Sequence, residues 1–200
     1  YRPTASRYWH RWATDYGTIK SYIDNQTDAQ YPQPVLADIE FDSDNSMILG
    51  FIDRSTFQFG YAAPDPSDTA DKVSERYFAA GDILRVGYDN SGTASVHSSV
   101  YQLEANGSVN QADGTTLTGA SSKSPTGPGG REFYADEWTG IGAGNHSDAL
   151  LGSLALKPGS DEVLTISSDA FRYYGAGVMF HSNTDGSMTG GVQIFTSNYN

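Results

Sequence analysis

The sequence contains no cysteine, which excludes disulfide bonds and thiolate metal sites. Basic residues are scarce: 12 Lys and Arg stand against 24 Asp and Glu, for a formal net charge of −12 at pH 7. Binding to nucleic acid or to an anionic membrane needs a basic surface, so neither partner is predicted. Long apolar runs are also missing, and no segment approaches the ~20 residues of a membrane-spanning helix.

The chain starts at Tyr1 without an initiator methionine or a recognisable signal peptide. We therefore expect a processed N-terminus, or a chain cut from a longer one. What the sequence does contain is 22 Gly and 12% aromatic residues. This mixture is typical of short strands joined by many turns.

Two segments resemble each other at a constant offset of 115 residues. Residues 36–53 and 151–168 each show an alternating apolar run, a polar turn and a second apolar run, which is the pattern of a β-hairpin. Within them, Ile48 matches Val163 and Leu49 matches Leu164. A repeated hairpin favours a repeat architecture over a single catalytic core.

The same pattern predicts four strands in each half of the chain. They are expected at about 35–41, 47–52, 81–88 and 94–102, and again at about 149–156, 162–167, 176–182 and 190–196. Tandem four-stranded antiparallel units are the blades of a β-propeller. Two blades cannot close a ring of about four to eight, so we expect part of a larger propeller. The alternative all-β fold is a single eight-stranded β-sandwich.

Four regions follow from this organisation. Residues 1–34 are an aromatic-rich connector or the end of a preceding blade, and 35–104 are the first four-stranded unit. Residues 105–148 are a long loop rich in Gly, Ser and Pro, and 149–200 are the second unit. The connector's aromatic rings either pack onto the β core or form an exposed platform for sugars.

Several motifs carry a resemblance. They are 36–54 (LADIEFDSDNSMILGFIDR), 80–85 (AGDILR), 127–136 (GPGGREFYAD) and 146–163 (HSDALLGSLALKPGSDEV). Their order and spacing resemble the propeller-like region of large bacterial secreted or surface proteins. Such proteins often also carry Cna-B-type modules of the serine-aspartate-repeat adhesin kind. The resemblance implies an extracellular or cell-surface bacterial propeller, and it supplies no catalytic residue.

A row of carboxylates is the first candidate site. Asp38, Glu40 and Asp42 alternate along one predicted strand and so share one face. Such a row could hold a cation or supply the acid–base pair of a glycosidase. The alternative is the wet lining of a channel, with Arg54 neutralising one acid. The second hairpin has no acids at the matching positions, so the fold does not require the row.

The turn after this strand is a candidate Ca²⁺ site. Asp42 and Asp44 have part of the spacing of an EF-hand loop, but Met47 stands where that loop needs glycine. The turn is therefore either an irregular Ca²⁺ site that uses Asp42 and Asp44 or a plain polar turn without a metal. No other cofactor is predicted, and the scattered histidines lack zinc-binding spacing.

The long loop holds the candidate ligand-binding residues. Carboxylates beside aromatic rings suit sugar recognition, and loops on a rigid scaffold often carry binding residues. The predicted ligand-binding residues are Glu132, Tyr134, Trp138 and His146, and Asp136 and Glu137 are further candidate acids for a hydrolase. In the alternative, the aromatic residues are core anchors. Three Asn-x-Ser/Thr sequons begin at Asn25, Asn106 and Asn145 and are incidental in a bacterial protein.

The preferred function is a non-enzymatic extracellular module for adhesion, surface assembly or carbohydrate contact. A carbohydrate-active hydrolase using Asp38, Glu40, Asp136 and Glu137 is the first alternative. A subunit of an extracellular filament, with neighbours paired at open strand edges, is the second. The expected partners are other blades of the same parent chain, neighbouring subunits or carbohydrate.

Overall fold

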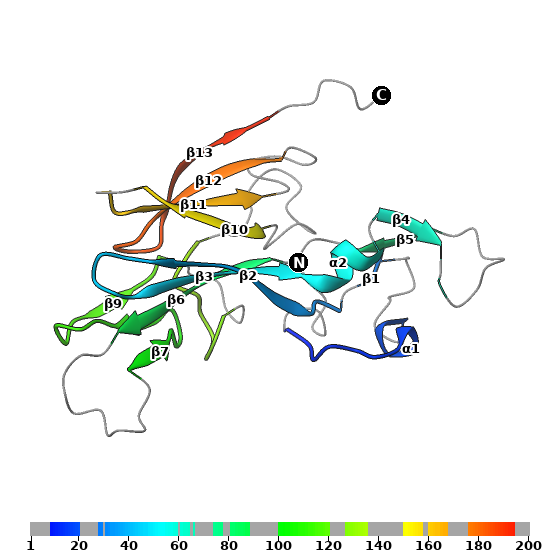
Figure 1. Ribbon diagram of the computed structural model, residues 1–200, viewed down its shortest axis with the longest axis horizontal. Helices are drawn as coiled ribbons and strands as arrows, with labels where there is room; N and C mark the ends of the chain where they lie inside the picture. The colour runs from blue at the N-terminus through cyan, green and yellow to red at the C-terminus, as the bar shows by residue number, and fades with distance from the viewer. Residues whose placement is uncertain are drawn as a thin grey trace.

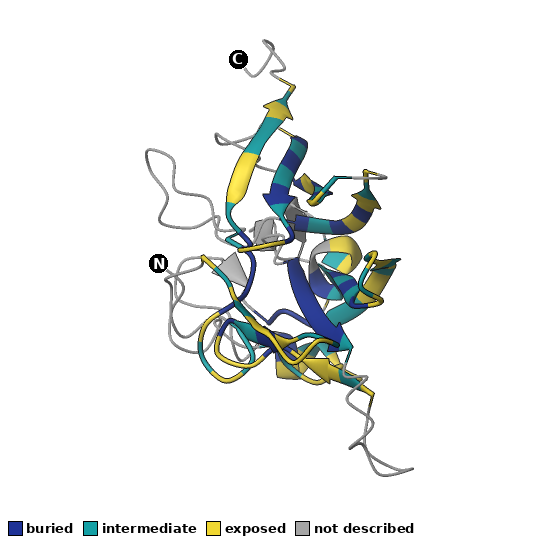
Figure 2. Ribbon diagram, turned by 90° about the vertical axis from the view of Figure 1, so that its left-hand side faces the viewer, coloured by how far each residue is buried: buried dark blue, intermediate teal, exposed yellow. Residues whose placement is uncertain are grey.

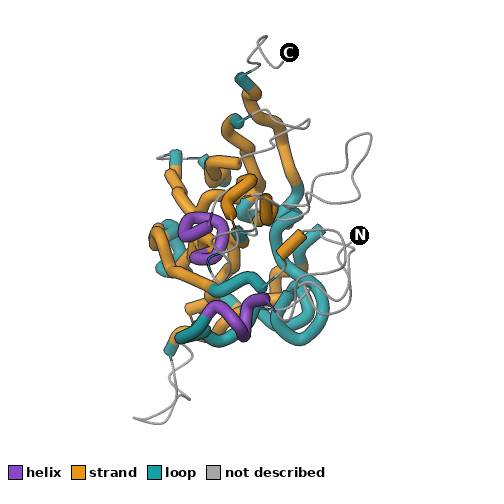
Figure 3. The backbone as a smooth tube through the Cα atoms, turned by 90° about the vertical axis from the view of Figure 1, so that its right-hand side faces the viewer, coloured by secondary structure: helices purple, strands orange, loops and turns teal. Residues whose placement is uncertain are grey.

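The computed structural model describes most of the chain, in twelve stretches. They are residues 9–20, 28–29, 31–59, 61–64, 66, 74–77, 81–88, 100–120, 127–135, 150–157, 160–167 and 176–194. Strands dominate these stretches, and the two helices among them are short (Figures 1 and 3). The prediction of an all-β chain is confirmed.

The first four-stranded sheet has the order β2-β3-β6-β7, and every neighbouring pair is antiparallel. Its strands are β2 (Pro34–Phe41), β3 (Met47–Asp53), β6 (Asp82–Tyr88) and β7 (Tyr101–Leu103). The second sheet has the order β10-β11-β12-β13, again antiparallel throughout. Its strands are β10 (Leu150–Leu156), β11 (Glu162–Ser167), β12 (Gly177–Ser182) and β13 (Met188–Gln193). In each sheet the strands thus lie side by side in their sequence order, as in a meander, although the segment between Asp53 and Asp82 intervenes between β3 and β6.

Smaller elements surround these sheets. A three-stranded sheet has the order β1-β5-β4, with β1 (Asp28–Ala29), β4 (Tyr61–Pro64) and β5 (Ser74–Tyr77). The hairpin β8 (Ser108–Asn110) and β9 (Thr116–Thr118) lies in the stretch that the composition suggests is a loop. The helices are α1 (Tyr16–Lys20) and α2 (Arg54–Phe59). In α2, the Asp53 carboxylate caps the first turn by accepting a hydrogen bond from the Ser55 backbone N–H at 2.8 Å.

The two four-stranded sheets share one hydrophobic core. Buried residues from both sheets form a single cluster with the loop residues Phe133 and Tyr134. The cluster consists of Ile48, Ile83, Val109, Phe133, Tyr134, Leu150, Leu154, Val163 and Met179. Strand β6 is buried along nearly its whole length and runs through the middle of the molecule (Figure 2). The matching residues Ile48 and Val163 thus enter the same core from opposite sheets.

Two glycines allow the sheets to approach closely. A Cβ atom built on Gly50 of β3 would lie 2.0 Å from the carbonyl oxygen of Gly152 in β10. Gly152 itself has a φ of +72°, in the left-handed region that favours glycine. No residue with a side chain fits at Gly50 without separating the backbones. This contact sets β10 against the first sheet.

The predicted propeller ring is not observed in the described part of the chain. Each sheet keeps two free edges there, and neither sheet continues into the other. No helix among the described residues is long and apolar enough to cross a membrane.

The N-terminal aromatic residues contact the first sheet. The Trp9 indole N–H donates to Asp82 Oδ2 at 3.2 Å, and its ring lies 6.3 Å from that of Phe51. The ring of Trp12 is covered on one face by the Arg54 guanidinium at 5.0 Å. Arg54 also donates to Gln33 Oε1 at 2.8 Å, so its described contacts are with Gln33 and the N-terminal segment rather than the predicted carboxylates.

Candidate functional site

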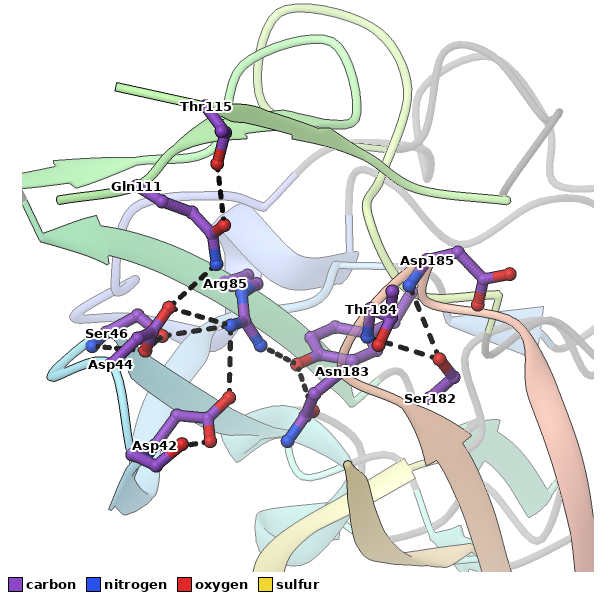
Figure 4. Close-up of polar contacts among 12 residues, drawn as sticks. Asp42, Asp44, Ser46, Arg85, Gln111, Thr115, Ser182, Asn183, Thr184 and Asp185 are labelled. Carbon is purple, nitrogen blue, oxygen red and sulfur yellow. Dashed lines mark hydrogen bonds and ion pairs between the residues drawn. The ribbon is translucent and has the colours of Figure 1, made fainter. Parts of the chain in front are cut away.

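The most distinctive polar feature is a buried cluster centred on Arg85. Arg85 lies in the middle of β6 and is 1% exposed. Its Nη2 atom contacts Asp42 Oδ2 at 3.0 Å, Asp44 Oδ2 at 3.5 Å and Ser46 Oγ at 3.0 Å (Figure 4). One guanidinium therefore holds the whole turn between β2 and β3.

That turn is ordered by its own hydrogen bonds. Asn45 has a φ of +66°, and Asp44 Oδ1 accepts a hydrogen bond from the Ser46 backbone N–H at 2.9 Å. Gln111, which lies in the turn of the β8–β9 hairpin, donates a hydrogen bond to Asp44 Oδ2 at 2.8 Å. Burial alone would raise the pKa of Asp44, but the Ser46 hydrogen bonds and the charge of Arg85 outweigh it and lower that pKa. Asp44 is therefore a stable carboxylate partner for the buried cation.

Tyr134 connects this cluster to the second sheet. Its hydroxyl accepts from Arg85 Nη1 at 3.3 Å and donates to Asn183 Oδ1 at 2.8 Å. Asn183 lies in the turn between β12 and β13, and its backbone N–H donates a hydrogen bond to the backbone carbonyl of Asp161. Complete burial raises the pKa of Tyr134, so its hydroxyl stays protonated and can donate. A chain of polar contacts thus runs from the β2–β3 turn to the β12–β13 turn.

Glu104 is a second buried carboxylate beside Arg85. Its Oε2 accepts the Arg85 backbone N–H at 2.7 Å, and its Oε1 accepts the Phe133 backbone N–H at 2.8 Å. The side chain therefore ties β6 to the segment that carries Tyr134. Burial raises the pKa of Glu104 to about 7, although the two backbone hydrogen bonds oppose the rise.

The raised pKa of Glu104 makes stability depend on pH in a defined direction. The folded state binds this proton more tightly than the unfolded chain, in which the pKa is near 4.5. The contribution is fully present below pH ~4.5 and is lost as the pH rises through about 7, up to ~3 kcal/mol. Urea unfolding of wild type and Glu104→Gln between pH 4 and 8 should show a steeper loss for wild type. Parallel pH profiles would contradict the assignment, because glutamine does not titrate.

The three predicted carboxylates, two on β2 and Asp42 directly after it, make different contacts in the structure. Asp38 accepts the Leu154 backbone N–H of β10 at 3.0 Å and that of Ile39 at 2.9 Å. Glu40 is half-buried on the same strand, while Asp42 contacts Arg85. A bulge between Leu36 and Asp38 interrupts the alternation. Asp38 is therefore a link between the sheets.

The proposed Ca²⁺ ligands Asp42 and Asp44 both lie against the Arg85 guanidinium. A fixed positive charge at 3.0 Å and 3.5 Å already neutralises these carboxylates. Among the residues that the structure describes, no group of three or more His, Cys, Asp or Glu could hold a metal ion. The Ca²⁺ site stays a prediction.

Two of the predicted ligand-binding residues are buried. Tyr134 is 0% exposed and Glu132 is 2% exposed, so the Tyr134 ring offers no face to a sugar. Trp138 and His146 lie outside the described residues, as do Asp136 and Glu137. The position of Tyr134 in the core matches the alternative interpretation of the aromatic residues as core anchors.

Sequence reasoning missed the residues that organise this cluster. Arg85, Gln111 and Asn183 come from three separate parts of the chain. One signal was available, because an arginine in the centre of an apolar strand needs a buried anionic partner. The pattern could not identify that partner.

Two long proteins of Dictyostelium discoideum are similar to this chain. Colossin-A is 30% identical over 165 residues, which is 82% of this chain and 1% of that protein. Colossin-B is 30% identical over 157 residues, which is 78% of this chain and 3% of that protein. The chain thus spans only a small fraction of the length of the curated relatives that it matches. No family model matches, and no solved structure matches.

These similarities correct the resemblance drawn from the motifs. The assignment to bacterial surface proteins with propeller and Cna-B-type modules is wrong, because the matched proteins come from a eukaryote and no family model supports it. The motifs resembled that family because short alternating strands and polar turns recur in many β proteins.

Proposed function

We propose that this chain is a non-catalytic structural or binding module of a long extracellular protein. The observation that carries the proposal is the mismatch in length between the chain and its relatives. The similarity covers about four-fifths of this chain but only 1% and 3% of the two Colossins. A segment of this size within a very long protein is typical of one module among many.

The chemistry of the described polar groups supports a structural role. Asp42 and Asp44 neutralise Arg85, Glu104 accepts two backbone N–H groups, and Asp38 accepts one from the opposite sheet. A hydrolytic site needs two carboxyl groups facing each other across an open cleft. These carboxylates are engaged in holding the fold.

For the fold, we favour a β-sandwich over a pair of propeller blades. The matching residues Ile48 and Val163 meet in one core. In consecutive blades, equivalent side chains would point the same way around the ring and would not meet. Two sheets packed face to face bring them together.

The partners that we propose are neighbouring modules of the same parent chain. The length of the relatives supports this, because most of each Colossin lies outside the matched segment. Carbohydrate contact would depend on aromatic residues other than Tyr134, whose ring is buried.

Two measurements on the whole protein test the proposal. Fractionation of cells that make it is expected to recover it from the medium or the cell surface. Incubation of the purified chain with a panel of polysaccharides is expected to release no reducing ends. The double variant Asp38→Asn, Glu40→Gln serves as the matched control and should behave like wild type.

Each part can fail by itself. Recovery only from the cytosol would overturn the extracellular location. Release of reducing ends by wild type that is lost in the double variant would overturn the non-catalytic role.

A further inference from the structure

A tight turn presents one of the three sequons at the surface. Asn106 and Gly107 form the two-residue connection between Ala105 and Ser108, whose backbone groups bond each other at 2.9 and 3.1 Å. Asn106 has a φ of +53° and Gly107 a φ of +73°. Asn-Gly is the preferred pair for such a turn, because both positions need positive φ. The turn geometry therefore explains the first two residues of the sequon.

Asn106 is the exposed one of the two central residues of this turn. Asn106 is exposed, while Gly107 is buried against the chain at Glu132, whose carbonyl oxygen would lie 2.8 Å from a Cβ on Gly107. The Asn106 backbone N–H donates to the Pro128 carbonyl, which fixes the turn without using the side chain. Within the described part of the chain, the Asn106 amide makes no hydrogen bond. A large group attached to this amide would extend into solvent.

We infer that Asn106 is an acceptor for an N-linked oligosaccharide, and this inference rests on the proposed extracellular function. The donor class is an oligosaccharide bound to a lipid through pyrophosphate. The Asn106 Nδ2 atom forms a bond to the sugar C1, the bond from C1 to the phosphate oxygen breaks, and the lipid pyrophosphate leaves. The amide nitrogen gives up one proton to a base of the transferring enzyme. Asn-x-Ser/Thr is the acceptor pattern for this reaction.

The eukaryotic origin of the relatives makes the sequon a candidate for N-glycosylation. In a bacterial protein the pattern would be incidental, but the matched proteins belong to Dictyostelium, a eukaryote. The sequons at Asn25 and Asn145 lie outside the described residues, so the structural argument applies to Asn106. Two features therefore agree at this position: Ser108 completes the acceptor pattern, and Asn106 is exposed in a hydrogen-bonded turn.

The hydroxyl of Ser108, the third residue of the sequon, makes one contact with the neighbouring strand in the folded protein. In the folded protein, Ser108 Oγ lies 3.2 Å from Thr118 Oγ1 of β9, and Ser108 is half-buried. The hydroxyl is therefore engaged once the β8–β9 hairpin has formed. The exposed position of Asn106 lets the folded turn tolerate the attached sugar.

The test uses the full chain with a cleavable secretion signal in a eukaryotic host. A C-terminal tag carries its own Asn-x-Thr acceptor, so the competence of the host is measured on the same molecule. Mass spectrometry after enzymatic removal of N-glycans in heavy-oxygen water should mark position 106 as a labelled aspartate. The label should disappear in Ser108→Ala. It should persist in Thr118→Ala, which removes the same hydroxyl contact but keeps the sequon.

An unlabelled Asn106 in molecules whose tag is labelled would overturn the inference. A label at position 106 that persists in Ser108→Ala would also overturn it, because spontaneous deamidation of Asn-Gly in heavy-oxygen water leaves the same mark without a glycan. The secretion signal is supplied, so this experiment does not depend on where the native protein resides. Its failure is therefore distinguishable from failure of the proposed extracellular location.

Discussion

Arg85→Met is expected to lower the free energy of unfolding by ~3–5 kcal/mol. The change removes the buried cation and leaves Asp42 and Asp44 without their partner, while Tyr134 loses a donor. Removing one member of a buried ion pair is costly because the remaining charge keeps its desolvation penalty. The Asp42 and Asp44 side chains are 16% and 29% exposed, so the loss should lie near the lower end of that range. Urea denaturation followed by tryptophan fluorescence measures it.

Two control variants test the mechanism. The triple variant Arg85→Met, Asp42→Asn, Asp44→Asn should recover part of the lost stability, because it removes the unpaired carboxylates as well. Arg85→Lys should remain destabilised. Arg85 uses Nη2 for the Asp42 carboxylate and Nη1 for the Tyr134 hydroxyl, whereas lysine has a single nitrogen for both. If Arg85→Met lowered the free energy of unfolding by less than ~1 kcal/mol, the effect would be no larger than that of a surface salt bridge. That result would contradict the central position of Arg85 in the cluster.

Gly50→Ala is expected to be as damaging, at ~3 kcal/mol or more, and can prevent folding. The added Cβ would lie 2.0 Å from the Gly152 carbonyl oxygen and 2.9 Å from the Gly152 carbonyl carbon. Both atoms belong to the backbone of β10, so no side-chain rotation relieves the clash. Strands β3 and β10 must therefore separate. Thermal unfolding by circular dichroism measures the loss, as the yield of folded protein does if the variant is too unstable.

Gly190→Ala is the matched control for Gly50→Ala. Gly190 also lies in a strand, β13, and its added Cβ would meet only the Phe180 ring at 3.7 Å, an ordinary contact. This variant should therefore keep a melting temperature close to that of wild type. Equal melting temperatures for Gly50→Ala and Gly190→Ala would contradict the close contact between the sheets.

The strands of the two meanders were predictable because burial on one side of a strand forces a two-residue alternation. In β12, Gly177, Met179 and His181 are buried and the residues between them are not. The same rule failed on β2, where an unbroken alternation would place Ile39 and Phe41 on one face with Val35 and Ala37. The β-bulge between Leu36 and Asp38 shifts the alternation of the two faces by one residue. Leu36 is therefore exposed on the same side of the bulge-shifted pattern as Ile39 and Phe41. A bulge depends on contacts with neighbouring strands, which a local pattern does not contain.

The offset of 115 residues identified both hairpins but not their register. Phe41 pairs with Met47 in the first hairpin, whereas Leu156 pairs with Val163 in the second. The pairing therefore differs by one residue between the two copies. Turn geometry sets this register, and the two turns differ in sequence.

The polar cluster was harder to predict because its members are far apart in the sequence. Asp42 and Asp44 are local to one turn and were identified as acidic candidates, but their partner Arg85 is 41 residues or more away. Tyr134 matched the composition of a sugar-binding loop, although its ring is fully buried. Composition shows which groups can bind and does not show whether tertiary packing has covered them.

The shared core also constrains how such a module is inherited. Gly50 and Gly152 belong to different sheets, and a change at either position alters the fit of the other. Recombination that exchanged one sheet for that of a distant homologue would pair surfaces that had not changed together. The segment from β2 to β13 should therefore pass between genes as one unit, and breakpoints between its two sheets should be selected against.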